Sequence, residues 1–197
     1  MNRSTTKKYP AFLNLENKNV LIIGGGNVAL EKLPTVFASG AKITIISLEF
    51  NLDVTDFLTT HPSITKIQRK IEMDDLKNRD LIFSATNNGQ LNRELVDEAH
   101  RLNIWINSCD DPSNCDFYSA AVFDRGPIRI AVSTDGRFAG LGGLVKSVLN
   151  EILPEETDEE WNALVDFRES LKLKVKDPSE RKRILTALLA DLRRSYF

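Results

Sequence analysis

Short apolar runs rich in β-branched residues alternate with longer segments of helical periodicity through the first half of the chain. The runs typical of strands are Val20–Ile23, Lys42–Ile46, Ile64–Gln68, Asp80–Ala85 and Ile104–Asn107. The segments typical of helices are 28–39, 54–60 and 90–102. Parallel strands need a long crossover between them, which is usually a helix. The alternation therefore predicts an α/β fold with a Rossmann-type, doubly wound parallel sheet.

The strand-helix alternation stops after Asn107. A turn-rich stretch, CDDPSNCDF, leads into two strand-like runs, SAAVF and PIRIAVS, which a turn joins. A helix is expected from Leu141 to Leu153, and the charged remainder should also be helical, with a capping box at Thr157–Glu160 and a cap at Asp177. These changes predict a nucleotide-binding domain at residues 1–112, a strand region suited to a dimer arm at 113–153, and a small helical domain at 154–197.

The composition excludes several classes of partner. With 42% hydrophobic residues, 27% charged residues and a net charge of -2, the chain has no bulk attraction for nucleic acid or anionic lipid. No window approaches the roughly 18 apolar residues of a spanning helix, so we expect a cytoplasmic protein that binds neither membranes nor nucleic acid. The spacing of Cys109 and Cys115 favours free thiols, and two histidines, His61 and His100, are too few for a dedicated metal site.

The segment GGGNVA follows the first strand and opens the first helix, with the pattern G-x-G-x-x-A at Gly24, Gly26 and Ala29. Gly24 would make the tight turn, Gly26 would let backbone N–H groups approach a pyrophosphate, and Ala29 would let the helix pack close to the sheet. The alternative is a plain turn. The place of GGGNVA between a strand and a helix favours the dinucleotide site.

Two further loops are expected at the same edge of the sheet. The second strand ends at Ser47, and Glu49 could bind ribose hydroxyls there, although a solvated loop carboxylate explains Glu49 equally well. That strand end has no Arg or Lys to bind a 2′-phosphate, which favours NAD over NADP as cofactor. The loop SATNNGQLN should border the nucleotide as well. The alternative is a helix cap at Asn88 or a turn at Gly89, and both interpretations can hold together.

The block INSCDDP follows the fifth strand and carries two adjacent carboxylates, Asp110 and Asp111. A carboxylate at this edge could act as a general base beside a nicotinamide. From the spacing alone, a cap or turn role is favoured, because Asp followed by Asp-Pro is common in turns.

The chain resembles the precorrin-2 dehydrogenase module of siroheme synthases, some members of which also insert iron into sirohydrochlorin. The resemblance runs from about Tyr9 to Pro154 and rests on the order and spacing of five blocks. These are YPAFLNLENKNVLIIGGGNVALEKL, GAKITIIS, DLIFSATNNGQLNRELVDEA, INSCDDPSNCDF and DRGPIRIAVSTDGR.

The resemblance implies an NAD-binding domain, a dimerisation region of extended strands and a small helical tail, with two chains interlocked as a homodimer. The family's catalytic aspartate, an acid or base in an N-x-x-D-x-P block, falls on Asp110. The residues expected to bind the cofactor by this resemblance are Gly24, Gly26, Asn27, Val28, Thr86 and Asn87.

The expected substrate, precorrin-2, is a tetrapyrrole with many carboxylates, and its oxidation needs a hydride acceptor, a base and cations. The candidate cations are Arg125, Arg129, Arg137 and Lys146, each of which could equally be a solvated surface charge.

The chain departs from the family on the substrate side. Ala120 stands where the family has a proline, Phe138 and Ala139 replace Ser and Pro, and Gly143 replaces an arginine. The first hypothesis is therefore an NAD-dependent precorrin-2 dehydrogenase, with iron insertion left open. The second is a related module that binds a dinucleotide or a tetrapyrrole without catalysis.

Overall fold

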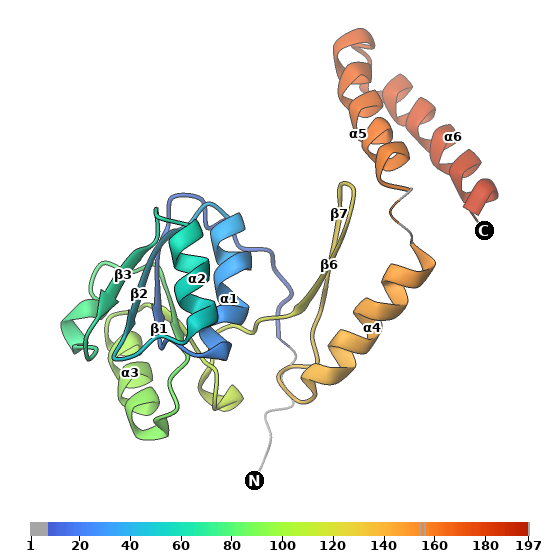
Figure 1. Cartoon of the computed structure of the whole chain (residues 1–197). Helices are drawn as coiled ribbons and strands as arrows, with labels where there is room; N and C mark the ends of the chain where they lie inside the picture. The colour runs from blue at the N-terminus through green and yellow to red at the C-terminus, as the bar shows by residue number, and fades with distance from the viewer. Residues whose placement is uncertain (1–7, 154, 156, 197) are drawn as a thin grey trace. The chain divides into compact units, whose positions relative to one another are not determined.

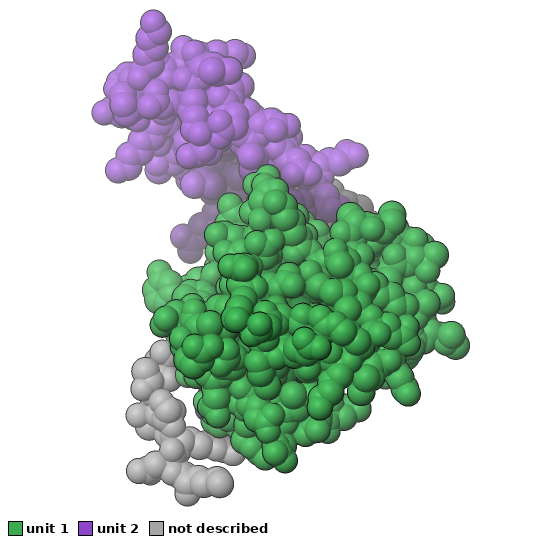
Figure 2. Space-filling model, turned by 90° about the vertical axis from the view of Figure 1, so that its left-hand side faces the viewer, with its two compact units in different colours: residues 1–119 green, residues 120–197 purple. Residues whose placement is uncertain are grey.

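The computed structural model describes residues 8–153, 155 and 157–196. The chain forms two compact units, which meet in the sequence between Ser119 and Ala120 and are coloured green and purple in Figure 2. The finer division predicted from the sequence, at 1–112, 113–153 and 154–197, stays a prediction.

The first unit is built on a five-stranded parallel sheet, which confirms the predicted α/β fold (Figure 1). Its strands are β1 (Asn19–Ile23), β2 (Lys42–Ser47), β3 (Thr65–Gln68), β4 (Leu81–Ser84) and β5 (Trp105–Ser108). They lie in the order β3-β2-β1-β4-β5, and every neighbouring pair is parallel. The chain order reverses between β1 and β4, and ligands of open α/β sheets bind beside such a switch point, at the carboxyl ends of the strands.

Helices cover both faces of this sheet. α1 (Asn27–Ala38) and α2 (Leu52–Thr60) pack on one face, while α3 (Gly89–Arg101) and the short 3-10 helix η1 (Met73–Leu76) pack on the other. Alternate residues of β1 serve the two cores: Val20 and Ile22 face α1, and Leu21 and Ile23 face α3. This two-sided burial explains why β1 is a continuous apolar run instead of an alternating one.

Local capping moves one boundary from its predicted place. α2 begins at Leu52, two residues before the expected start, because the side chain of Asn51 accepts a hydrogen bond from the backbone N–H of Val54 at 2.8 Å. Asn51 lies outside the predicted helix, so this cap was not predicted.

The second unit pairs a hairpin with helices. β6 (Ala121–Arg125) and β7 (Ile128–Val132) form the predicted pair of strands, which is antiparallel. α4 (Ala139–Ile152) packs against the hairpin, and α5 (Thr157–Lys174) pairs with α6 (Pro178–Tyr196). A Cβ on Gly142 would lie 3.3 Å from both the Ala121 Cβ and the Val132 carbonyl oxygen, so this glycine permits the close approach of α4 to the hairpin.

The helix starts of the tail are confirmed in part. Asp177 caps α6 as predicted, since its carboxylate accepts the backbone N–H groups of Ser179 at 3.0 Å and Glu180 at 3.3 Å. The capping box expected at Thr157 depends on a side chain outside those that are described. Of the helices in the described ranges, none has both the length and the apolar character to span a bilayer.

Candidate functional site

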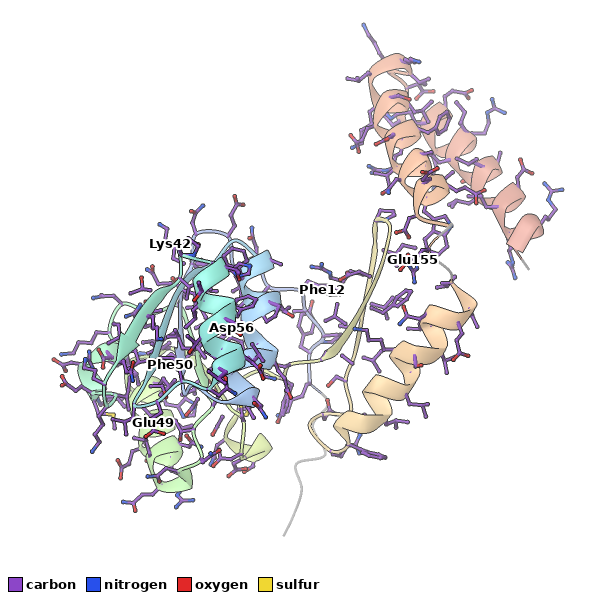
Figure 3. All side chains as sticks on the ribbon, in the orientation of Figure 1. Phe12, Lys42, Glu49, Phe50, Asp56 and Glu155 are labelled. Carbon is purple, nitrogen blue, oxygen red and sulfur yellow. The ribbon has the colours of Figure 1, made fainter. Side chains whose placement is uncertain are left out.

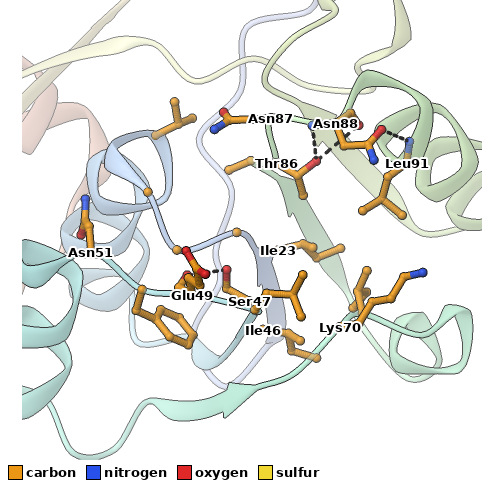
Figure 4. Close-up of a pocket in the computed structure, with 18 of the residues that line it drawn as sticks. Ile23, Ile46, Ser47, Glu49, Asn51, Lys70, Thr86, Asn87, Asn88 and Leu91 are labelled. Atoms are coloured by element: carbon orange, nitrogen blue, oxygen red, sulfur yellow. Dashed lines mark hydrogen bonds between the residues drawn. The ribbon is translucent and has the colours of Figure 1, made fainter.

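A cavity of about 1010 Å³ lies at the carboxyl ends of β1, β2 and β4 (Figure 4). Figure 3 shows the direction of β2, because Lys42 begins the strand and Glu49 lies just beyond its carboxyl end. All the residues predicted to bind the cofactor line the cavity: Gly24, Gly26, Asn27, Val28, Ser47, Glu49, Thr86 and Asn87. The fold thus brings three separate loops to one site, beside the switch point of the sheet.

The glycine loop at the floor of the cavity is held by backbone contacts. Gly24 has φ +118°, and a Cβ there would lie only 2.3 Å from the carbonyl oxygen of Ala85. Its N–H donates to the carbonyl oxygen of Ile46 at 2.9 Å. A Cβ on Gly26, in contrast, would meet no described atom within 4 Å. Gly24 is therefore required by the turn, while the missing side chain of Gly26 leaves room in the cavity.

The amino end of α1 opens into the same space. Gly26 is its N-cap, no side chain among the described residues caps it, and its first turn carries no acidic residue. Unsatisfied N–H groups and the helix dipole make such an end attractive to an anion. The side chain of Asn27 instead braces the loop, since its Oδ1 accepts a hydrogen bond from Asn51 Nδ2 at 2.7 Å. This cradle fits the diphosphate of a dinucleotide.

The loop after β2 supplies the expected ribose side of the cavity. Ser47 Oγ donates to the backbone carbonyl of Glu49 at 2.7 Å and so shapes the loop (Figure 4). The Glu49 side chain is exposed at the cavity. This leaves its carboxylate accessible to a hydroxyl group.

Two cations that the sequence analysis overlooked, Arg69 and Lys70, also line the cavity. Both follow β3, which pairs with β2, so the end of the neighbouring parallel strand was the signal that could have identified them. The Asp75 carboxylate accepts hydrogen bonds from Arg69 at 2.7 Å and 2.6 Å, and these bonds hold the pKa of Asp75 below its usual value. Arg69 is thus engaged, while Lys70 is exposed.

The loop after β4 carries both roles considered for it. Thr86 and Asn87 line the cavity, as does Asn88. Asn88 also caps α3, since its side chain accepts the N–H groups of Gln90 and Leu91 at 3.1 Å each. The cap and the cavity border coexist.

Asp110 follows β5 next to the start of α3. Its Oδ1 accepts a hydrogen bond from Ser108 Oγ at 2.6 Å, and its Oδ2 would lie 3.3 Å from a Cβ on Gly89. Burial acts to raise the pKa of Asp110, but the hydrogen bond from Ser108 and the charge of Arg93 act against it, and the pKa is lowered. Asp110 is therefore a carboxylate at neutral pH, in the state of a proton acceptor.

The neighbouring Asp111 has the turn role that the spacing favours. It caps the 3-10 helix η2 (Pro112–Asn114), accepting the Ser113 N–H at 2.9 Å. Cys109 and Cys115 are free, as predicted. Burial raises the pKa of Cys115 to about 11, so it is a thiol at neutral pH, and its Sγ accepts the Ser108 N–H at 3.2 Å. Asp111 and Cys115 thus shape the loop that presents Asp110.

The two histidines have local partners. His61 stacks on Phe57 with 4.0 Å between ring centroids, and His100 Nε2 lies 3.2 Å from the carboxylate of Asp116. In the part of the chain that is described, no three His, Cys, Asp or Glu side chains gather as candidate metal ligands.

The predicted substrate cations differ in environment. Arg125 is neither solvated nor open to a ligand within its unit: only 7% of its side chain is exposed. It donates to Asn150 Oδ1 at 3.2 Å, stacks over Phe123 and approaches Asp158 to 3.9 Å. This burial favours a structural role over the predicted substrate contact.

The other three cations are exposed. Arg129 pairs with Asp124 at 2.6 Å across the hairpin, and Arg137 Nε donates to the Thr134 carbonyl at 3.0 Å. Lys146 lies on the surface of α4. Their contact with substrate stays a prediction.

Replacing Arg125 with Met is expected to lower the free energy of unfolding by about 1–3 kcal/mol, because Asn150 loses a hydrogen-bond donor and the buried Oδ1 of Asp158 loses the guanidinium that lies 3.9 Å from it. Arg129→Met is the matched control, since it removes an exposed ion pair worth about 0–1 kcal/mol. Urea unfolding followed by circular dichroism measures both. Equal losses of stability in the two variants would contradict the structural role of Arg125.

The chain is similar in sequence to siroheme synthases. The chain is 31% identical over 174 residues to a siroheme synthase of Tolumonas auensis, covering 88% of this chain and 36% of that protein. It is 33% identical over 146 residues to a siroheme synthase of Nitrosomonas eutropha, covering 74% of this chain and 31% of that protein. The chain thus spans about a third of the length of these relatives, and the predicted resemblance to siroheme synthases is confirmed.

A solved structure, SirC, precorrin-2 dehydrogenase, shares the fold. It matches with a TM-score of 0.77 and 23% identity over 92% of this chain and 89% of that chain. Residues 11–121, more than half of the chain, match the family described as putative NAD(P)-binding. That match covers every residue predicted here to bind the cofactor, and the chain therefore belongs to this putative NAD(P)-binding family.

Proposed function

We propose that the protein is an NAD-dependent dehydrogenase that oxidises precorrin-2 to sirohydrochlorin. The observation that carries the proposal is an ionised carboxylate, Asp110, next to the start of α3, whose cap Asn88 lines the dinucleotide cavity. The likeness to siroheme synthases, and the fold shared with a precorrin-2 dehydrogenase, support this choice of substrate.

The residues of the cavity divide the binding of NAD among them. The N–H groups of Gly26 and the first turn of α1 would hold the diphosphate, Ser47 and Glu49 the ribose side, and Thr86 and Asn87 would flank the rest of the nucleotide. When bound, NAD⁺ supplies the hydride acceptor.

Asp110 performs the proton transfer. Oxidation removes a hydride and a proton from the macrocycle, and the carboxylate of Asp110 accepts the proton. Ser108 holds Oδ1 through its 2.6 Å hydrogen bond, which orients the carboxylate.

The preference for NAD over NADP is part of the proposal. The Glu49 carboxylate suits a ribose with free hydroxyls and repels a 2′-phosphate. Lys70 lies in the same cavity, so NAD⁺ and NADP⁺ should be titrated side by side, with the expectation that NAD⁺ binds more tightly.

One assay tests the function. Purified protein is incubated with precorrin-2 and NAD⁺, and sirohydrochlorin is followed by its absorbance; formation only with the dinucleotide present is expected. A second arm with sirohydrochlorin and ferrous iron tests iron insertion. If no sirohydrochlorin forms although NAD⁺ and precorrin-2 both bind, the dehydrogenase proposal is wrong, whatever the outcome of the iron arm.

The second candidate, a module that binds dinucleotide or tetrapyrrole without turnover, rests on α4. Gly143 stands where the resembling family has an arginine, and a Cβ there would meet no described atom within 4 Å. The chain therefore lacks, on this open surface, an arginine that could bind a carboxylate of the substrate. Tight binding without turnover in the same assay would favour this candidate.

The proposed assembly is a homodimer. The residues of α4 that expose apolar surface share one helical stripe: Leu141, Leu144, Val145, Val148 and Ile152. A helix with an apolar stripe is stable only when another surface covers it, and symmetric pairing of two chains would cover this one. We also propose a cytoplasmic location, because free thiols such as Cys109 persist in that compartment.

Leu144→Asp is expected to convert the dimer to a monomer, because its side chain is 60% exposed at the centre of this stripe. Sedimentation velocity measures the change at micromolar concentration. Leu52→Asp, on an exposed leucine of α2, is the matched control and should remain dimeric. Monomeric wild-type protein would contradict the assembly.

A further inference from the structure

Asn51 joins the two loops that follow β1 and β2 at the border of the cofactor cavity (Figure 4). Its backbone N–H donates to the carbonyl oxygen of Gly25 at 2.9 Å. Its Nδ2 donates to Asn27 Oδ1 at 2.7 Å, and its Oδ1 accepts the backbone N–H of Val54 at 2.8 Å. A Cβ on Gly25 would lie only 2.2 Å from the carbonyl oxygen of Glu49, so the two loops also meet through their backbones.

The hydrogen bonds of Asn51 determine which way two side-chain amides point. The backbone N–H of Val54 can only donate, so the oxygen of Asn51 faces it and the nitrogen of Asn51 faces Asn27. An amide nitrogen does not accept a hydrogen bond, so Asn27 presents its own oxygen to Asn51. The Nδ2 of Asn27 is therefore left as a donor for another partner.

This donor belongs to the cavity. Asn27 is the first residue of α1, it is exposed, and it lines the cavity. In the parts of the chain that the structure describes, no group accepts a hydrogen bond from its Nδ2. The backbone N–H groups at the same helix end attract an anion, and a side-chain N–H beside them adds one more donor for it.

We propose that Asn51 is a positioning residue for the cofactor. It holds the amide of Asn27 with the nitrogen available to the cavity, where Nδ2 donates a hydrogen bond to a phosphate oxygen of NAD⁺. The opposite orientation would direct a carbonyl oxygen at the phosphate, which repels it. The inference rests on the proposed place of the diphosphate at the start of α1, and not on the identity of the substrate.

Two substitutions of Asn51 separate this role from its role as a helix cap. Serine and aspartate both replace asparagine well at an N-cap, so Asn51→Ser and Asn51→Asp should keep the acceptor for Val54 and leave the urea midpoint nearly unchanged. Serine is too short to reach Asn27, which then loses its fixed orientation. The dissociation constant of NAD⁺, measured by calorimetry, should rise about 3–10-fold in Asn51→Ser.

Asn51→Asp should have the larger effect. The introduced carboxylate only accepts hydrogen bonds, so Asn27 must turn its nitrogen toward it and its oxygen toward the phosphate. The dissociation constant of NAD⁺ should rise about 10–100-fold, through this reversal and through repulsion by the new charge. The same substitution in an Asn27→Ala background measures the repulsion alone.

A double-mutant cycle shows whether Asn51 acts through Asn27. Asn27→Ala removes the donor and should itself weaken NAD⁺ binding about 3–10-fold. Adding Asn51→Ser to Asn27→Ala should then cause no further loss, whereas independent effects would multiply. Thr55→Ala is the matched control, because it removes a hydrogen bond to the Asn51 carbonyl at 3.0 Å and alters neither amide. It should leave the affinity for NAD⁺ unchanged.

The side-chain amide ¹⁵N resonance of Asn27, assigned by its absence in Asn27→Ala, provides a spectroscopic readout. NAD⁺ should shift this resonance in the wild-type protein, because the amide then donates to a phosphate. The shift should be lost in Asn51→Asp at saturating NAD⁺, although the protein is folded and loaded. A purely structural role of Asn51 predicts the same shift in both proteins.

Losses of affinity that multiply in the cycle, or wild-type affinity in both Asn51 variants, overturn the inference. If the wild-type protein still oxidises precorrin-2 with NAD⁺ in that case, the proposed function stands. A wild-type protein that does not bind NAD⁺ overturns the inference and the proposed function together. Losses that do not multiply, with an amide shift that depends on Asn51, support the inference.

Discussion

Asp110→Asn is expected to lower kcat for precorrin-2 oxidation by about 10²–10⁴-fold, the usual contribution of a positioned general base. The amide is nearly isosteric and can still accept the Ser108 hydroxyl hydrogen bond at Oδ1, but it cannot take a proton from the macrocycle. NAD⁺ affinity should change less than about twofold, because Asp110 is not among the residues that line the cavity. Steady-state kinetics and NAD⁺ titration calorimetry measure the two quantities.

The matched control for this variant is Asp111→Asn. Asp111 carries the same charge one residue further on, but its carboxylate caps η2 through Ser113 and Asn114. Its asparagine variant keeps an acceptor for the cap and should retain most of the activity. Similar rates in the two variants would show that the charge of the loop matters, and not the base at position 110.

Gly24→Ala and Gly26→Ala form the second decisive comparison, since they separate folding from cofactor binding. At Gly24 a methyl group meets the Ala85 carbonyl oxygen at 2.3 Å, with φ at +118°. Strain and overpacking together should lower the free energy of unfolding by about 2–5 kcal/mol. At Gly26 the methyl group meets no described atom within 4 Å and φ is -99°, so stability should change by less than about 0.5 kcal/mol.

The cofactor affinity should follow the opposite pattern. A methyl group at Gly26 enters the space assigned to the diphosphate, so NAD⁺ should bind at least about tenfold more weakly to a protein that is otherwise intact. Urea unfolding gives the free energy of unfolding of each variant, and NAD⁺ titration gives its cofactor affinity. Unchanged NAD⁺ affinity in Gly26→Ala would place the diphosphate elsewhere.

The fold of the first unit was predictable because three of its strands, β1, β2 and β4, are buried on both faces. That burial makes β1 uniformly apolar, and each helix between the strands shows its own periodicity. The cofactor loops followed from the same reasoning, since the carboxyl ends of parallel strands share one edge. The start of α2 was missed because a single cap, Asn51, extends the helix beyond its apolar pattern.

The residues that sequence reasoning missed depend on neighbours distant in the chain. Lys70 enters the cavity because β3 lies beside β2, and the buried Asn92 of α3 accepts a hydrogen bond from Ser84 at the end of β4. Arginine side chains are usually exposed, yet the Arg125 side chain is buried, where it contacts Asn150 and Phe123. Periodicity reveals which side of a helix or strand is buried, but not which polar group a buried side chain will meet.

The contact between Gly24 and Ala85 also bears on how this site can be altered. Two cofactor loops meet there backbone to backbone, so no choice of side chain at position 24 widens the cavity. Glu49 and Lys70, in contrast, line the cavity with exposed side chains. Selection of variants that bind a different nucleotide should therefore yield substitutions of Glu49 and Lys70. Position 24 should remain glycine in such variants.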